Sequence, residues 1–146
     1  NYTFFNRNSV PESISHTTEF KSLCPDSAVC MKKNLSIYKV FPEPIFYLPK
    51  ADIPFEGCTA FLVQEKNNQI IYMYFEQDLI LPEHNHNAQW GIVLEGKIEL
   101  TINGMTKIYT KGERYFIPEG INHKGKIFGG YADITFFNQP NRYDIK

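Results

Sequence analysis

The chain has no block of basic residues and almost no net charge. Its 15 Lys and Arg residues stand against 16 Asp and Glu residues, which leaves a formal net charge of -1 over 146 residues. Proteins that bind nucleic acids usually neutralise phosphates with clustered Lys and Arg. We therefore expect no nucleic-acid partner.

Long hydrophobic runs are also missing. No segment approaches the roughly 18 consecutive apolar residues that a membrane-spanning helix needs. The first residues, Asn1 to Arg7, lack the basic start and the apolar stretch of a secretory signal. We therefore expect no membrane association and a cytoplasmic location.

Cysteine is scarce and shows no pattern. Cys24, Cys30 and Cys58 are odd in number and have no CxxC spacing. A reduced cytoplasmic protein is the simplest interpretation, and a Cys24–Cys30 disulfide is the alternative.

What the chain has is enough length for one domain and many aromatic residues. Its 12 Phe and 9 Tyr favour strands over helices. Residues 1–44 are polar and show no sustained period, so we expect an N-terminal extension, irregular or partly strand. Met31 precedes a Lys-Lys-Asn sequence, as at the start of a bacterial reading frame, which makes residues 1–30 a candidate upstream extension. We expect the main domain over residues 45–138 and a polar tail over residues 139–146.

From residue 45 onward the sequence consists of short, β-rich runs between turn residues. The expected strands are 45–48, 59–63, 69–75, 89–94, 97–102, 105–110, 114–117, 123–128 and 131–137. Asn103-Gly104 predicts a two-residue hairpin turn of type I′. No convincing amphipathic helix follows residue 45. Short strands at this spacing predict an all-β sandwich or barrel.

Histidine is rare, and three of the four histidines fall between residues 84 and 123. His84 and His86 are two positions apart, so on a strand their side chains point to the same face. This geometry suits two ligands of one metal ion. His123 closes a second patterned stretch that starts at Gly112.

These two stretches resemble the paired motifs of the cupin superfamily. In the first motif, His84 and His86 occupy the histidine positions and Gly96 the closing glycine, whereas Asp78 replaces the leading glycine. Gln89 stands where glutamate is usual. Only two residues separate Gln89 from His86, so this loop is one residue shorter than the family pattern.

The second motif matches in order and spacing. Gly112, Pro118, Gly120 and His123 occupy their positions, and Ile127 replaces the final asparagine. The resemblance covers about residues 45–137. It implies a double-stranded β-helix, or jelly-roll, cupin barrel of the small RmlC-like type, and a homodimer in which residues 1–44 are candidates for partner contacts.

The resemblance further implies one divalent metal ion, with His84, His86, Gln89 and His123 as its ligands. Imidazole and oxygen ligands together suit Zn, Ni, Mn or Fe. A neutral glutamine leaves the full charge of the ion in place, which favours anionic ligands. Alternatively, Gln89 hydrogen-bonds a substrate instead of the metal. Gln89-Trp90-Gly91 is also similar to cupins that act on unsaturated uronic acids.

We therefore predict a Lewis-acid enzyme that isomerises or tautomerises a small polar or anionic metabolite such as a sugar acid. A non-catalytic metabolite-binding cupin and an Fe-dependent dioxygenase are the alternatives. Asp133 is a candidate base, and Tyr131 shares its face of the last strand. Tyr72 is a further candidate for substrate binding. The only tryptophan, Trp90, is expected to pack between the sheets or at a subunit contact.

Overall fold

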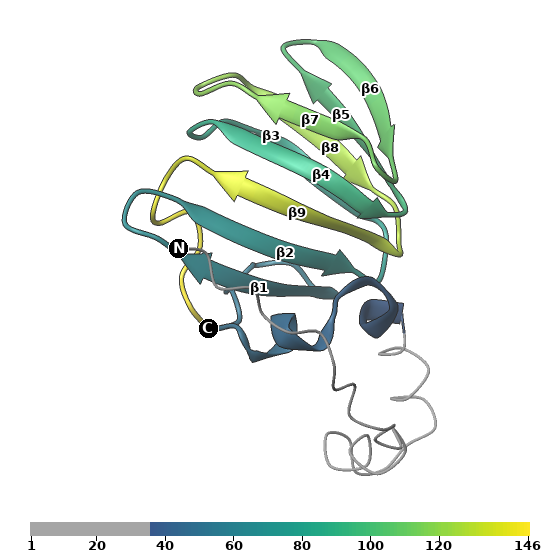
Figure 1. The fold of residues 1–146 in the computed structure, drawn as a ribbon. Coiled ribbons are helices and arrows are strands. Elements are labelled where there is room, and N and C mark those ends of the chain that lie inside the picture. Colours follow the sequence, from purple (N-terminus) through teal and green to yellow (C-terminus); the bar gives the residue numbers. More distant parts are fainter. Residues whose placement is uncertain (1–35) are drawn as a thin grey trace, which may run out of the picture.

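The structure, a computed structural model, describes residues 36–146 and contains two antiparallel sheets in that range. One sheet has the strand order β1-β2-β9-β4-β7 and the other has the order β3-β8-β5-β6 (Figure 1). The strands are β1 (Cys58–Gln64), β2 (Gln69–Phe75), β3 (Leu79–His84), β4 (Gln89–Glu95), β5 (Lys97–Ile102), β6 (Met105–Thr110), β7 (Arg114–Ile117), β8 (His123–Ile127) and β9 (Tyr131–Phe137). This arrangement confirms the expected all-β jelly-roll.

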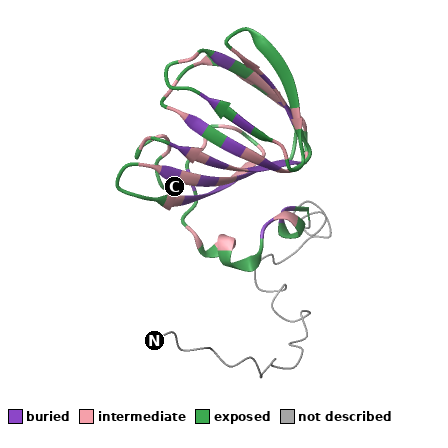
Figure 2. Ribbon diagram, turned by 45° about the horizontal axis from the view of Figure 1, so that its top comes forward, coloured by how far each residue is buried: buried purple, intermediate pink, exposed green. Residues whose placement is uncertain are grey.

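The core lies between the two sheets and is built from alternate residues of each strand. On β2, Met73 and Phe75 face this core, whereas Tyr72 and Tyr74 pack on the opposite face. The alternation of buried and exposed positions is visible along the strands in Figure 2. Strands with this period of two bury one face of each sheet against the other.

Two local predictions were wrong. Residues 45–48 do not form a strand, because Glu43–Tyr47 is a 3-10 helix, η2, with proline in its first turn. Proline has a helix-compatible φ and lacks an N–H that would be unpaired there in any case. The strand β3, which contains Pro82, was not among the expected strands. That strand pairs only with β8, and an edge strand tolerates proline.

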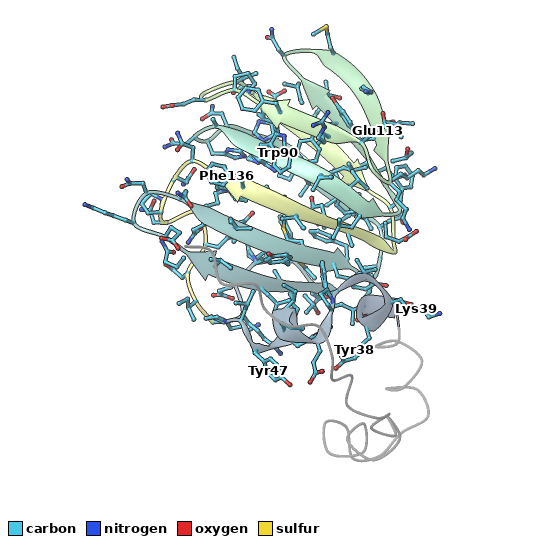
Figure 3. All side chains as sticks on the ribbon, viewed as in Figure 1. Tyr38, Lys39, Tyr47, Trp90, Glu113 and Phe136 are labelled. Atoms are coloured by element: carbon cyan, nitrogen blue, oxygen red, sulfur yellow. The ribbon has the colours of Figure 1, made fainter. Side chains whose placement is uncertain are left out.

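The segment before β1 covers part of the outer face of the five-stranded sheet. Residues 36–40 are helical, and Ile37 and Phe41 pack with Phe61 and Tyr74. Farther along this face, Trp90 is 39% exposed and its strand partner is Phe136 (Figure 3). Trp90 therefore does not lie between the sheets.

Among residues 36–146, no helix is long and apolar enough to cross a membrane.

The C-terminal residues are tied to the barrel by specific hydrogen bonds. The Gln69 side chain donates to the Tyr143 carbonyl at 2.8 Å and accepts from the Tyr143 N–H at 3.1 Å. Ile145 forms a β-bridge with Ala51. These contacts hold the C-terminal residues on the barrel, where Tyr143 lines its internal cavity.

Candidate metal centre

Three histidine side chains converge where β3 meets β8. His84 ends β3 and is paired directly with His123, the first residue of β8. His86 follows in the loop before β4. The potential ligand atoms of the three residues all lie within 4.8 Å of one another. The two motifs therefore meet in space, as the resemblance to the cupin superfamily implied.

Each imidazole is oriented by its own backbone contact. Nδ1 of His84 lies 2.8 Å from the Pro82 carbonyl oxygen. Nδ1 of His86 lies 2.6 Å from the Asn87 oxygen, and Nδ1 of His123 lies 2.9 Å from the Ile121 oxygen. A carbonyl oxygen only accepts, so each Nδ1 carries the proton and donates it. Each Nε2 then keeps its lone pair, which is the tautomer that a metal ligand requires.

The surroundings of His86 and His123 favour the neutral form of their imidazoles. Burial is the main cause that lowers the pKa of His86 to about 4, and the positive charge of Arg142 lowers it further. Burial also lowers the pKa of His123, with smaller contributions from His84 and Arg142. Neutral imidazoles at physiological pH do not have to lose a proton before they bind a cation. The donor set therefore fits a divalent metal ion of the kind that the resemblance implies.

Gln89 lies beside this cluster despite the shortened loop. It is the first residue of β4, is 9% exposed, and lines the same cavity as the three histidines. Its Nε2 donates to the Tyr115 hydroxyl oxygen at 3.3 Å. This hydrogen bond uses the NH₂ group of the amide and leaves its oxygen free of that contact.

The histidines and Gln89 line a cavity of about 280 Å³ inside the barrel. Most of its other walls are apolar, with Ile53, Phe75, Leu100 and Ile117 among them. A cavity of this size holds a small molecule and not a polymer.

Arg142 is a cavity residue that the sequence analysis did not identify. Its guanidinium lies 5.8 Å from the Phe137 ring centroid and 5.1 Å from that of Tyr143. Its Nε is buried and has no hydrogen-bond partner among the described residues. Stacking on two rings holds a cation in place without neutralising it. Arg142 therefore offers a fixed positive charge to an anion in the cavity.

Asp133 also lines the cavity and is 1% exposed. Its Oδ2 accepts hydrogen bonds from Tyr131 at 2.7 Å and from Tyr115 at 3.0 Å, whereas Oδ1 has no partner within residues 36–146. Burial raises the pKa of Asp133 to about 6, against the lowering effect of these hydrogen bonds. A carboxyl group with this pKa exchanges a proton near neutral pH.

The other two candidates lie elsewhere. Tyr131 is fully buried, donates a hydrogen bond to Asp133 and is not among the residues that line the cavity. Tyr72 lies on the opposite face of the sheet, where its ring packs edge-on against Phe41 at 5.9 Å. We therefore withdraw Tyr72 as a ligand-binding residue. Cys58 is a free thiol, and Cys24 and Cys30 lie outside the described residues.

Comparison with known proteins agrees with this architecture. Residues 73–129 match the family model of the cupin domain. Together with the two-sheet barrel, this match supports the resemblance of the chain to the cupin superfamily. Among curated proteins, none matches this chain.

Several solved structures share the fold. An RmlC-like cupin from Shewanella frigidimarina aligns with a TM-score of 0.56 at 21% identity, over 64% of this chain and 86% of that one. KdgF from Halomonas sp. aligns with a TM-score of 0.55 at 18% identity, over 63% of this chain and 88% of that one. A mutant oxalate decarboxylase from Bacillus subtilis aligns at 0.53 and 19% identity, over 64% of this chain but only 28% of that one. At these identities the similarity concerns the fold alone.

Proposed function

We propose that this protein is a divalent-metal cupin that binds a small carboxylate in its barrel and acts on it as a Lewis-acid enzyme. The observation that carries the proposal is the convergence of three imidazoles whose Nδ1 atoms are all engaged by backbone carbonyls. This arrangement leaves three lone pairs directed to one small volume.

His84, His86 and His123 would hold the metal ion, with the amide oxygen of Gln89 as the fourth protein ligand. Three nitrogens and one oxygen suit Zn, Ni, Mn or Fe. When bound, such an ion supplies Lewis-acid polarisation of a carbonyl oxygen. None of the four proposed ligands carries a negative charge, so the charge of the ion is not cancelled by the protein.

The positive charge of Arg142 in the cavity favours an anionic ligand. Its unneutralised guanidinium lines the cavity and contributes to the lowered pKa of His86 and His123. Arginine binds carboxylates through a planar fork of N–H donors. The apolar walls favour a carboxylate with an apolar body over a sugar acid, because each unpaired hydroxyl of a buried sugar would cost about 1–3 kcal/mol.

Asp133 favours an enzyme over a passive binding protein. Its carboxyl group lines the cavity, has one oxygen without a partner among the described residues, and has a pKa of about 6. These properties suit a group that takes a proton from a carbon next to a polarised carbonyl and returns it elsewhere. The expected reaction is therefore an isomerisation or tautomerisation. An Fe-dependent dioxygenase is less favoured, because its usual ligand set includes a carboxylate.

The test starts with elemental analysis of purified protein and of His84→Ala. We expect about one divalent ion per chain in the wild type and its loss in the variant. If the wild type holds no stoichiometric ion even after incubation with Zn²⁺, Ni²⁺, Mn²⁺ and anaerobic Fe²⁺, the proposed function is wrong.

Ligand binding is then measured by calorimetry on the metal-loaded protein with phenylacetate and with galacturonate. We expect the apolar acid to bind more tightly, and Arg142→Met to weaken it by about 10-fold to 100-fold, as expected for a lost hydrogen bond to a charged group. Lys146→Met is the matched control, because Lys146 does not line the cavity. Equal effects of the two variants would remove Arg142 from the ligand site.

A further inference from the structure

The side chain of Gln89 belongs to a buried hydrogen-bond chain that leads away from the metal centre. Gln89 Nε2 donates to the Tyr115 oxygen, the Tyr115 hydroxyl reaches Asp133 Oδ2 at 3.0 Å, and Tyr131 reaches the same oxygen at 2.7 Å. We propose that Tyr115 and Asp133 are positioning residues that hold the Gln89 amide with its oxygen, and not its NH₂ group, toward the three histidines. This inference rests on the proposed metal site.

The direction of each hydrogen bond in this series follows from which groups can donate a proton and which can only accept one. An ionised carboxylate accepts hydrogen bonds and donates none, so the Tyr115 hydroxyl uses its only proton on Asp133. The Tyr115 oxygen is left as an acceptor. Gln89 must therefore present its NH₂ group to Tyr115, because an amide oxygen placed there would face another oxygen without a proton between them. The amide oxygen then points to the other side.

Gly91 makes this contact sterically feasible. It is the strand partner of Tyr115, and a Cβ atom built on Gly91 would overlap Cζ and Oη of the Tyr115 side chain. The phenol ring thus crosses β4 over a residue without a side chain and reaches Gln89, two positions earlier on the same face of the strand. The Gln-Trp-Gly sequence therefore has a structural reason that involves Tyr115.

Orientation matters because the two ends of an amide behave in opposite ways toward a cation. The oxygen carries a lone pair and partial negative charge, whereas the NH₂ group carries partial positive charge and does not bind a metal ion. A carboxylate at the same place would present an oxygen in either orientation. Glutamine needs an external group to fix its direction, and glutamate does not.

This difference supplies the experiment. Tyr115→Phe is made in the wild type and in the Gln89→Glu variant, and Co²⁺ affinity is measured for all four proteins by competition with a chelating dye. In the wild-type background, we expect Tyr115→Phe to weaken binding by about 10-fold to 100-fold, as for other groups that orient metal ligands. In the Gln89→Glu background, we expect little change. The visible absorption of bound Co²⁺ should likewise change with Tyr115→Phe only when Gln89 is present.

Tyr109→Phe is the matched control, since its ring lies 5.6 Å from that of Tyr115 and it does not hydrogen-bond Gln89. It should change neither affinity nor spectrum. If Tyr115→Phe prevents folding, Asp133→Asn replaces it, because a neutral amide no longer dictates the direction of the Tyr115 proton. Equal loss of affinity in the wild-type and Gln89→Glu backgrounds, or no loss in either, would overturn the positioning role. Failure of the wild type to bind Co²⁺ at all would instead overturn the proposed metal site.

Discussion

Replacement of Asp133 by Asn should make the free energy of unfolding of the metal-free protein depend differently on pH. Burial raises the pKa of Asp133 from 3.8 to about 6 in the folded state. The folded protein therefore binds more protons at this group than the unfolded chain does over that interval. By linkage, its contribution to stability is fully present below pH 3.8 and is lost as the pH rises through about 6.

The size of the effect follows from the pKa difference. A difference of roughly two pKa units corresponds to about 3 kcal/mol, at about 1.4 kcal/mol per unit. His86 and His123 act in the opposite direction, because a lowered pKa in the folded state makes stability rise with pH; for His86 this rise falls between about 4 and 6.5. The wild-type profile alone therefore mixes the two contributions. The difference between wild type and Asp133→Asn isolates Asp133, because both proteins keep the histidines.

The assay is urea unfolding at pH values from about 3.5 to 7.5 in the presence of a chelator. We expect the stability advantage of the wild type over Asp133→Asn to decrease by about 3 kcal/mol across this range and to level off above pH 7. A difference that stays constant with pH would show that Asp133 titrates as an exposed carboxylate. Asp133 would then be neither desolvated in the folded state nor suited to proton transfer near neutral pH.

Three further outcomes are expected. Gly91→Ala should destabilise the protein by about 1–3 kcal/mol in urea unfolding, because the added methyl group overlaps the Tyr115 ring; an unchanged midpoint would contradict this packing. Gln89→Glu should bind metal more tightly and bind phenylacetate more weakly by calorimetry, and an unchanged preference for anions would remove the charge argument. Burial raises the pKa of Cys58 to about 12. In a variant without the other two cysteines, this thiol should therefore react with a disulfide reagent at pH 8 only after the protein unfolds. Rapid reaction of the native protein would show that the thiol is accessible.

The strands were predictable because the alternation of core and surface residues is a local property of the sequence. The expected range 131–137 coincides with β9, whose buried face includes Tyr131 and Asp133. The range 45–48 failed because four apolar residues in a row do not distinguish a strand from a helical turn. The strand β3 was missed because Pro82 and Glu83 interrupt the apolar alternation that identifies a strand.

Of the residues in the candidate site, only those that belong to a sequence motif could be predicted. His84, His86 and His123 have characteristic spacing, so they could be found without coordinates. Arg142 could not, because its place in the cavity depends on hydrogen bonds between Gln69 and Tyr143, which are 74 residues apart in the chain. The expected homodimer and the cytoplasmic location stay predictions.

The charges around the cavity explain how glutamine at position 89, where the family usually has glutamate, is compatible with the binding of an anionic ligand. A glutamate at this position would place a negative charge beside the metal and reduce the attraction of an anionic ligand. In this chain the carboxylate of Asp133 is held in the barrel by two tyrosines, and Gln89 is neutral. Arg142 adds a positive charge that lines the same cavity. Metal charge and guanidinium therefore both favour a carboxylate, while the negative charge needed for proton transfer is kept on a residue outside the proposed ligand set.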